Sequence, residues 1–373
     1  MRSTVLCLAA LILETIALAT PTRAQQGAPA PSAGLPTREG DYVIRNFHFR
    51  SGETLPELRM HYTTLGKPER DANGRTTNAV LILHGTTGTG HQFLAPQFAG
   101  VLFGPGQLLD LSRYYIILPD NIGHGKSSKP SDGMHVHFPQ YGYADMVAAQ
   151  HDLIMDGLGV NHVRLVMGTS MGCMHSWMWG EAYPDAMDAL LPLACLPVQI
   201  AGRNRVWRKM LMDAIRADPA WKGGDYTTEP LDGLRTALDL MLIAGSAPVA
   251  MQKIYPTRDT ADDFLDGYMA ARLKAIQGGT VDANDLWYAF NASRDYDPSP
   301  DLERIKAPVM FINSADDFIN PPELGIAQRE IQRVKHGKFV LIPASDQTHG
   351  HGTHTWAAFW QQYLKELLEQ SRR

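Results

Sequence analysis

The sequence predicts an α/β fold, in which a mostly parallel central sheet is flanked by helices and a helical cap is inserted before the late strands. Short, continuously apolar runs alternate with segments of helical spacing, which is typical of strands buried on both faces of a parallel sheet. Between Leu196 and Pro308 the alternation stops, and only helical segments follow one another. The 373 residues, 44% of them hydrophobic, are enough for a large domain core.

The sequence predicts eight strands along the chain. Val43–Phe49 and Leu58–Thr64 flank the turn-like Ser51-Gly52-Glu53 and predict an antiparallel hairpin. Buried strands are then predicted at Ala79–Leu83, Tyr114–Leu118, Val163–Met167, Ala189–Leu193, Val309–Ile312 and Phe339–Ile342.

The helices follow from apolar residues at helical spacing. Around the sheet they are predicted at Tyr143–Gly157, Met171–Tyr183 and Trp356–Leu368. In the cap they are predicted at Arg205–Ala217, Leu231–Ala244 and Thr260–Ala275. Residues 42–197 and 308–373 are therefore expected to form the core, and residues 198–307 the helical cap.

The first residues are expected to be a signal rather than part of the fold. Arg2 precedes the short apolar run Val5–Ala19, and Thr22-Arg23-Ala24 follows as a small-residue cleavage site. The run is shorter than the roughly 20 residues of a membrane span. We expect residues 1–24 to be a cleaved signal peptide, with export to the periplasm and no membrane span afterwards, and residues 25–41 to be a flexible leader.

Charge and composition exclude other classes of protein. The net charge of −5 argues against a nucleic-acid surface, which needs a clustered basic stripe. No glycine-rich phosphate loop follows the first buried strand, and we expect no bound cofactor. The expected partner is a small-molecule ester or other acyl substrate, and a homodimer is an open alternative to a single chain.

The clearest chemical motif is Gly168-Thr169-Ser170-Met171-Gly172, which matches G-x-S-x-G. It stands directly after a predicted buried strand and directly before a predicted helix, the setting of a nucleophile elbow. Ser170 is therefore the predicted nucleophile, and the Met171 amide is a predicted oxyanion donor. The plainer alternative is a tight strand–helix turn whose serine only caps the helix.

A second oxyanion donor should come from the loop after the earlier strand Ala79–Leu83. Thr86 follows His84 and Gly85 in that loop, and its amide is the predicted donor. His84 is expected to hold the loop rather than to react.

The acid and the base are expected after late strands, in the order serine, acid, histidine. Asp317 ends the Val309–Ile312 region with a proline four residues on, and we choose it over its neighbour Asp316 as the acid. His351 is chosen as the base over His349 and His354 because glycines flank it. The three histidines could instead chelate zinc, but no carboxylate lies among them, and we expect no metal site.

Once the signal is removed, two cysteines remain. Cys173, one helical turn after Ser170, is expected to be buried packing. Its pairing with Cys195 is an alternative for an exported protein, although spacing alone gives no geometry.

These residues carry a family resemblance. The chain from about residue 42 to its end resembles the α/β-hydrolase superfamily and, within it, the homoserine O-acetyltransferases. The most specific pieces are the elbow around Ser170, the segment Ala214–Trp221 with Gly223–Tyr226, and Asp317 before Pro321-Pro322. The resemblance implies acyl-enzyme chemistry on Ser170, with Asp317 and His351 completing a triad.

The chain also departs from that family's pattern. Thr169, Cys173 and His175 replace residues of the family's nucleophile loop. Gly352 stands where the family has an Asp for the substrate amine, and Met212 stands where it has an Arg for the substrate carboxylate. We therefore expect a hydrolase of small or medium carboxylic esters. The alternatives are a homoserine O-acetyltransferase that uses acetyl-CoA and a non-catalytic binding protein with this fold.

Overall fold

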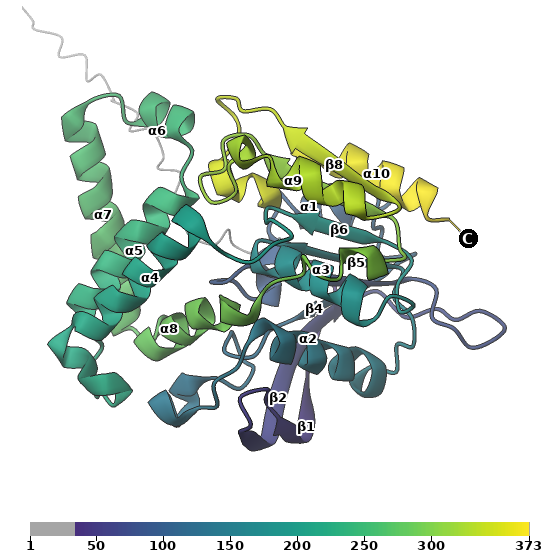
Figure 1. Ribbon diagram of the computed structural model, residues 1–373, viewed down its shortest axis with the longest axis horizontal. Coiled ribbons are helices and arrows are strands. Elements are labelled where there is room, and N and C mark those ends of the chain that lie inside the picture. The colour runs from purple at the N-terminus through teal and green to yellow at the C-terminus, as the bar shows by residue number, and fades with distance from the viewer. Residues whose placement is uncertain (1–33, 373) are drawn as a thin grey trace, which may run out of the picture.

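A computed structural model describes residues 34–372 and contains one eight-stranded sheet over this range (Figure 1). The strand order is β1-β2-β4-β3-β5-β6-β7-β8. The strands are β1 (Arg38–His48), β2 (Thr54–Leu65), β3 (Ala79–Leu83), β4 (Tyr115–Pro119), β5 (Leu165–Thr169), β6 (Leu190–Leu193), β7 (Val309–Ser314) and β8 (Gly337–Ile342). From β4 to β8 neighbouring strands pair in parallel, whereas β2 is antiparallel to both β1 and β4.

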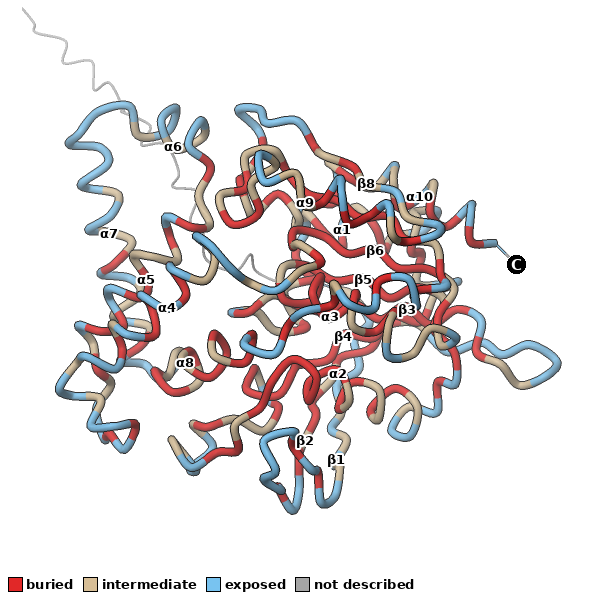
Figure 2. The backbone as a smooth tube through the Cα atoms, viewed as in Figure 1, coloured by how far each residue is buried: buried red, intermediate tan, exposed pale blue. Residues whose placement is uncertain are grey.

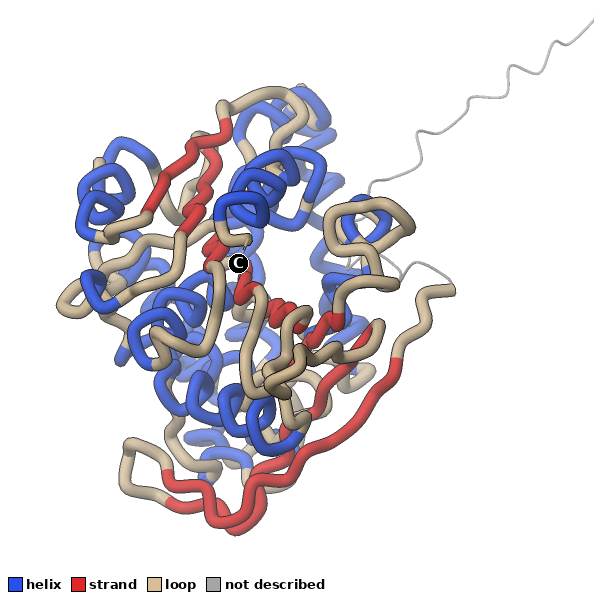
Figure 3. Tube along the Cα trace, turned by 90° about the vertical axis from the view of Figure 1, so that its right-hand side faces the viewer, coloured by secondary structure: helices blue, strands red, loops and turns tan. Residues whose placement is uncertain are grey.

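The N-terminal predictions fall partly outside the described residues. The predicted signal peptide, residues 1–24, and most of the predicted leader lie outside them. The end of the leader prediction is wrong, because β1 already begins at Arg38 and pairs along β2. Figure 3 shows this long hairpin at the edge of the sheet.

The central strands are buried on both faces, as their continuous apolar runs predict (Figure 2). Along β3, Leu81 and Leu83 pack into the core layer that contains α2 (Tyr143–Asp152) and α3 (Met171–Ala182). Val80 and Ile82 point to the opposite layer, which contains α1 (Ala99–Leu102) and α10 (Gln361–Gln370). Because successive side chains of a strand point to opposite faces of the sheet, this one short apolar run contributes to the hydrophobic cores on both faces.

Between β6 and β7 lie five of the described helices, which form the predicted cap beside the sheet (Figure 1). They are α4 (Gly202–Ala217), α5 (Leu231–Gly245), α6 (Pro248–Ile254), α7 (Arg258–Gln277) and α8 (Ala283–Asn291). Trp207, Leu211 and Ile215 repeat every fourth residue along α4 and belong to a separate cap core. The exact boundaries at residues 197 and 307 stay a prediction.

The closing helix is shorter than predicted. Residues 350–355 and 357–359 form 3₁₀ turns, and α10 begins only at Gln361; α9 (Ile326–Glu330) precedes β8. Over residues 34–372, no single helix is long and apolar enough to cross a bilayer. Helices α5 and α6 reach that length and composition only together, across a bend of 104°.

Candidate active site

Ser170 lies in a strained turn between β5 and α3. Its φ of 55° and ψ of −110° are unusual for a residue with a side chain. The flanking glycines are required by close packing: a Cβ on Gly168 would lie 2.2 Å from the Gly172 carbonyl oxygen, and one on Gly172 would lie 1.9 Å from that of Leu83. The turn therefore presents the Ser170 side chain at the carboxyl end of β5, as the motif predicts.

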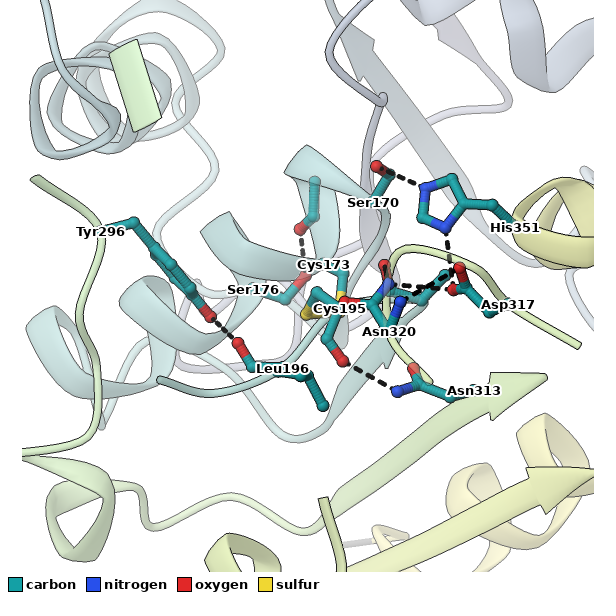
Figure 4. Close-up of a disulfide and its surroundings, with 12 residues drawn as sticks. Ser170, Cys173, Ser176, Cys195, Leu196, Tyr296, Asn313, Asp317, Asn320 and His351 are labelled. Atoms are coloured by element: carbon teal, nitrogen blue, oxygen red, sulfur yellow. Dashed lines mark hydrogen bonds and ion pairs between the residues drawn. A yellow bond between two sulfur atoms is a disulfide. The ribbon is translucent and has the colours of Figure 1, made fainter. Parts of the chain in front are cut away.

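The structure brings the three predicted triad residues together (Figure 4). The Ser170 hydroxyl lies 2.9 Å from Nε2 of His351, and Nδ1 of His351 lies 2.8 Å from Oδ2 of Asp317. The carboxylate can only accept, so Nδ1 carries the hydrogen and Nε2 is free to accept from the serine. This tautomer is the one that a general base needs.

The Asp317 carboxylate is fully buried but well provided with donors. Its Oδ1 accepts from the amides of Ile319 and Asn320, at 2.8 and 3.2 Å, and its Oδ2 accepts from the Asn320 side chain at 2.9 Å. Burial acts to raise the pKa of Asp317, but His351 and these hydrogen bonds outweigh it and hold the pKa below its usual range. Asp317 therefore stays ionised beside the imidazole. Asn320 was not found from the sequence, in which it is one polar residue of a loop.

Asp316, the alternative acid, makes its hydrogen bonds with residues other than His351. Its Oδ2 accepts from the Thr348 hydroxyl at 2.7 Å and from the Gly350 amide at 3.2 Å, and its Oδ1 accepts from the Ser314 hydroxyl. Asp316 thus fastens the loop that carries His351 to the end of β7.

The other two histidines of that loop have different surroundings. His349 stacks on Trp356, with ring centroids 4.3 Å apart. His354 is half-buried, and the loss of hydration together with the nearby His351 lowers its pKa to about 3, which makes it a poor proton acceptor near neutral pH. Over the described part of the chain no group of three His, Cys, Asp or Glu side chains is placed to hold a metal.

The predicted oxyanion loop packs against the nucleophile. A Cβ on Gly85 would lie 3.4 Å from the Ser170 Cβ, so the Thr86 backbone follows immediately beside the serine. The Thr86 carbonyl accepts from Nε2 of His124 at 2.7 Å. The Met171 amide, at the first position of α3, has no acceptor within its helix and is available to a ligand.

His84 holds this loop, as predicted. Its Nδ1 donates to the Gly85 carbonyl at 2.8 Å, and its Nε2 accepts from the Asn121 amide at 3.0 Å. Burial lowers the pKa of His84 to about 3, so the ring is neutral and both nitrogens are occupied.

Cys173 and Cys195 form a disulfide, which corrects the expectation that Cys173 only packs in the core (Figure 4). The bond joins the first turn of α3 to the loop after β6. That loop also receives side chains from the acid side of the site: the Ala194 carbonyl accepts from Asn320 at 3.1 Å, and the Cys195 carbonyl accepts from Asn313 at 2.9 Å. The disulfide therefore links the segment of the nucleophile to the segment of the acid.

A cleft of about 1020 Å³ lies between the cap and the core, on the acid side of the site. Asp317 and Met174 line it, together with apolar residues of the cap such as Ile243 and Met251.

The chain is similar in sequence to a known protein family. Residues 78–345 match the family model of the alpha/beta hydrolase fold, and the chain belongs to this family. The chain is an acyl-transfer enzyme of that fold.

Two relatives are similar to this chain over most of its length. A probable acyltransferase from Methanothermobacter thermautotrophicus is 31% identical over 76% of this chain and 84% of its own length. A homoserine O-acetyltransferase from Geobacter sulfurreducens is 29% identical over 86% of this chain and 93% of its own length.

Two solved structures share the fold. A homoserine O-acetyltransferase from Bacillus anthracis has a TM-score of 0.76 at 22% identity, covering 90% of this chain and 98% of its own. An acetylester hydrolase from Corynebacterium glutamicum has a TM-score of 0.75 at 23% identity, covering 89% of this chain and 96% of its own. The fold is thus shared by a transferase and a hydrolase.

Proposed function

We propose that Ser170, His351 and Asp317 are a catalytic triad that works through an acyl-enzyme. The observation that carries this proposal is the unbroken chain of two hydrogen bonds, 2.9 and 2.8 Å long, from the Ser170 hydroxyl to the Asp317 carboxylate. A serine that only capped α3 would not need an imidazole on its hydroxyl, and the Ser170 side chain makes no cap hydrogen bond to α3.

In the first half-reaction, His351 Nε2 takes the hydroxyl proton as Ser170 Oγ attacks the ester carbonyl carbon. The carbonyl oxygen becomes an oxyanion, which accepts hydrogen bonds from the Met171 and Thr86 amides, each worth on the order of 3 kcal/mol. Asp317 stabilises the imidazolium. When the intermediate collapses, the bond to the alcohol oxygen breaks and the imidazolium gives that oxygen its proton.

In the second half-reaction, water takes the place of the alcohol. His351 removes one of its protons as the water oxygen attacks the acyl carbon, and the same two amides hold the oxyanion. Collapse breaks the bond to Ser170 Oγ, which regains the proton from His351. The products are a carboxylic acid and the free enzyme.

We propose that the substrate is a small or medium carboxylic ester and that water is the acyl acceptor. Homoserine is a zwitterion and needs paired charges in a desolvated pocket. Gly352 offers no side chain for its amine, which would be left unpaired. The second candidate is acetyl transfer from acetyl-CoA to homoserine, which the name of the Geobacter relative favours.

One experiment separates these functions. Purified protein is incubated with acetyl-CoA and homoserine and, in parallel, with p-nitrophenyl esters of increasing chain length. We expect ester cleavage that Ser170→Ala abolishes, with no dependence on homoserine. Homoserine-dependent release of CoA at a higher kcat/KM would favour the transferase. A fluorophosphonate probe tests the third alternative, because a non-catalytic binding protein would not be labelled at Ser170.

We also propose that the protein is exported. The disulfide between Cys173 and Cys195 supports an oxidising compartment. Mass spectrometry of periplasmic material should find a mature N-terminus near Gln25, and protein that begins at Met1 in the cytoplasm would contradict export.

A further inference from the structure

Arg208 on α4 is a buried charge without an acidic partner among the described residues. Its side chain is 2% exposed. Nε donates to the Asn204 side chain at 2.9 Å, and Nη1 reaches the Ser293 hydroxyl only at 3.5 Å. The rings of Trp207 and Phe290 each lie 5.3 Å from its Cζ. The guanidinium is thus held in place by neutral groups, and among the described residues no carboxylate pairs with it.

This environment is unfavourable for a charge. Burial lowers the pKa of Arg208, although an arginine stays protonated at any working pH. A guanidinium loses favourable hydration free energy when it is buried. Contacts with aromatic rings and neutral side chains recover only part of this free energy, whereas an ion pair with a carboxylate would compensate for it. The stability of the cap therefore does not explain why an arginine stands at this position. A negative charge on the substrate would explain it.

Two buried hydroxyls lead from Arg208 toward the nucleophile, and both are unsatisfied. The hydroxyls of Tyr143, at the start of α2, and of Thr86 are buried, and neither has a hydrogen-bond partner. The Tyr143 hydroxyl interacts with both Arg208 and Thr86, although neither contact has the geometry of a hydrogen bond. Thr86 belongs to the loop that packs against Ser170. The unsatisfied groups therefore extend from the oxyanion loop to the guanidinium.

We propose that Arg208 and Tyr143 bind a carboxylate of the substrate, so that the enzyme acts on esters that carry a negative charge. A guanidinium presents a planar fork of donors that matches a carboxylate, and a hydroxyl adds a third donor. An entirely neutral ester would leave all these groups unpaired. This inference rests on the proposed acyl-enzyme function and specifies its substrate class.

The carboxylate belongs either to the acyl half or to the alcohol half of the ester, and matched substrates separate the two. Monoethyl succinate is compared with ethyl butyrate for the acyl half, and acetoxyacetate with ethyl acetate for the alcohol half. Hydrolysis is followed by titration of the released acid. We expect one charged ester to be cleaved with a higher kcat/KM than its neutral partner.

The variants are Arg208→Met, which keeps the length of the side chain without its charge, and Tyr143→Phe. The matched control is Lys209→Met, because Lys209 is the neighbouring cation on α4 and is exposed. Arg208→Met should lower kcat/KM for the preferred charged ester about 100-fold, the effect expected when one partner of a buried charge pair is removed. Its loss on the neutral ester should be at least tenfold smaller than its loss on the charged ester, and Lys209→Met should change neither.

Inhibition of the unaltered enzyme gives a second measurement that needs no variant to fold. Succinate should compete with neutral-ester hydrolysis, and Arg208→Met should abolish the competition. Two results would overturn the proposal: a preference of the unaltered enzyme for the neutral ester in both pairs without inhibition by succinate, or an equal loss on charged and neutral esters in a folded Arg208→Met. Labelling of Ser170 by a fluorophosphonate together with neutral-ester cleavage would show that the acyl-enzyme function stands even then.

Discussion

The Cys173–Cys195 disulfide should contribute strongly to stability and to the geometry of the site. The bond closes a loop with a sequence separation of 22. The chain-entropy relation for such a loop gives about 3 kcal/mol, through restriction of the unfolded chain. In a protein of this size we expect the double variant Cys173→Ala/Cys195→Ala to melt roughly 4 °C below the unaltered protein.

Activity should fall as well, even below the melting temperature. The loop after β6 holds Asn320, which in turn donates to Asp317 (Figure 4). A misplacement of about 1 Å in a catalytic group can cost up to roughly 100-fold in rate. The disulfide holds the segments that position the triad and is not expected to contact the substrate. Loss of the bond should therefore lower kcat by a larger factor than it raises KM.

Thermal unfolding and ester hydrolysis are measured with and without a phosphine reductant. Reduction should lower the melting temperature and kcat of the unaltered protein to those of the double variant, and it should leave the variant unchanged. Alkylation and mass spectrometry count the free thiols of the native protein. Two alkylated cysteines in the unreduced protein, or a double variant with unchanged melting temperature and kcat, would refute this reasoning.

Other predictions follow from single contacts. Gly172→Ala should destabilise the protein and remove most activity, because its Cβ would meet the Leu83 carbonyl oxygen; circular dichroism and ester hydrolysis test this. Asp316→Asn should keep activity within about tenfold but make the His351 loop less stable, whereas a loss as large as that of Asp317→Asn would reassign the acid. Burial raises the pKa of Glu181 to about 8, above its unfolded value near 4.5, so its ionisation costs stability increasingly as pH rises from about 4.5 through 8. Glu181→Gln should therefore raise the melting temperature at pH 9 but hardly at pH 5, and an equal shift at both would contradict this pKa.

The sequence alone determined much of the fold, because its signals are local. A run such as Ala79–Leu83 has no polar residue to face water, so it predicts a strand buried on both faces. The elbow is equally local, since Gly168 and Gly172 are required by atoms within a few residues of Ser170 and by the adjacent strand. The placement of the acid and base after late strands followed from the order of the motifs, and the structure brings Asp317 and His351 to Ser170.

Tertiary structure decided what depends on residues distant in the sequence. The spacing of Cys173 and Cys195 says nothing about the separation of their sulfur atoms, which the packing of α3 against the end of β6 fixes. The sequence does not distinguish the two adjacent aspartates of the loop. In the structure, Asp317 contacts His351, whereas Asp316 contacts Thr348. Likewise, Arg208 is one of several basic residues on an amphipathic helix. Only the folded cap buries it without a counter-charge, because burial depends on which helices cover that face.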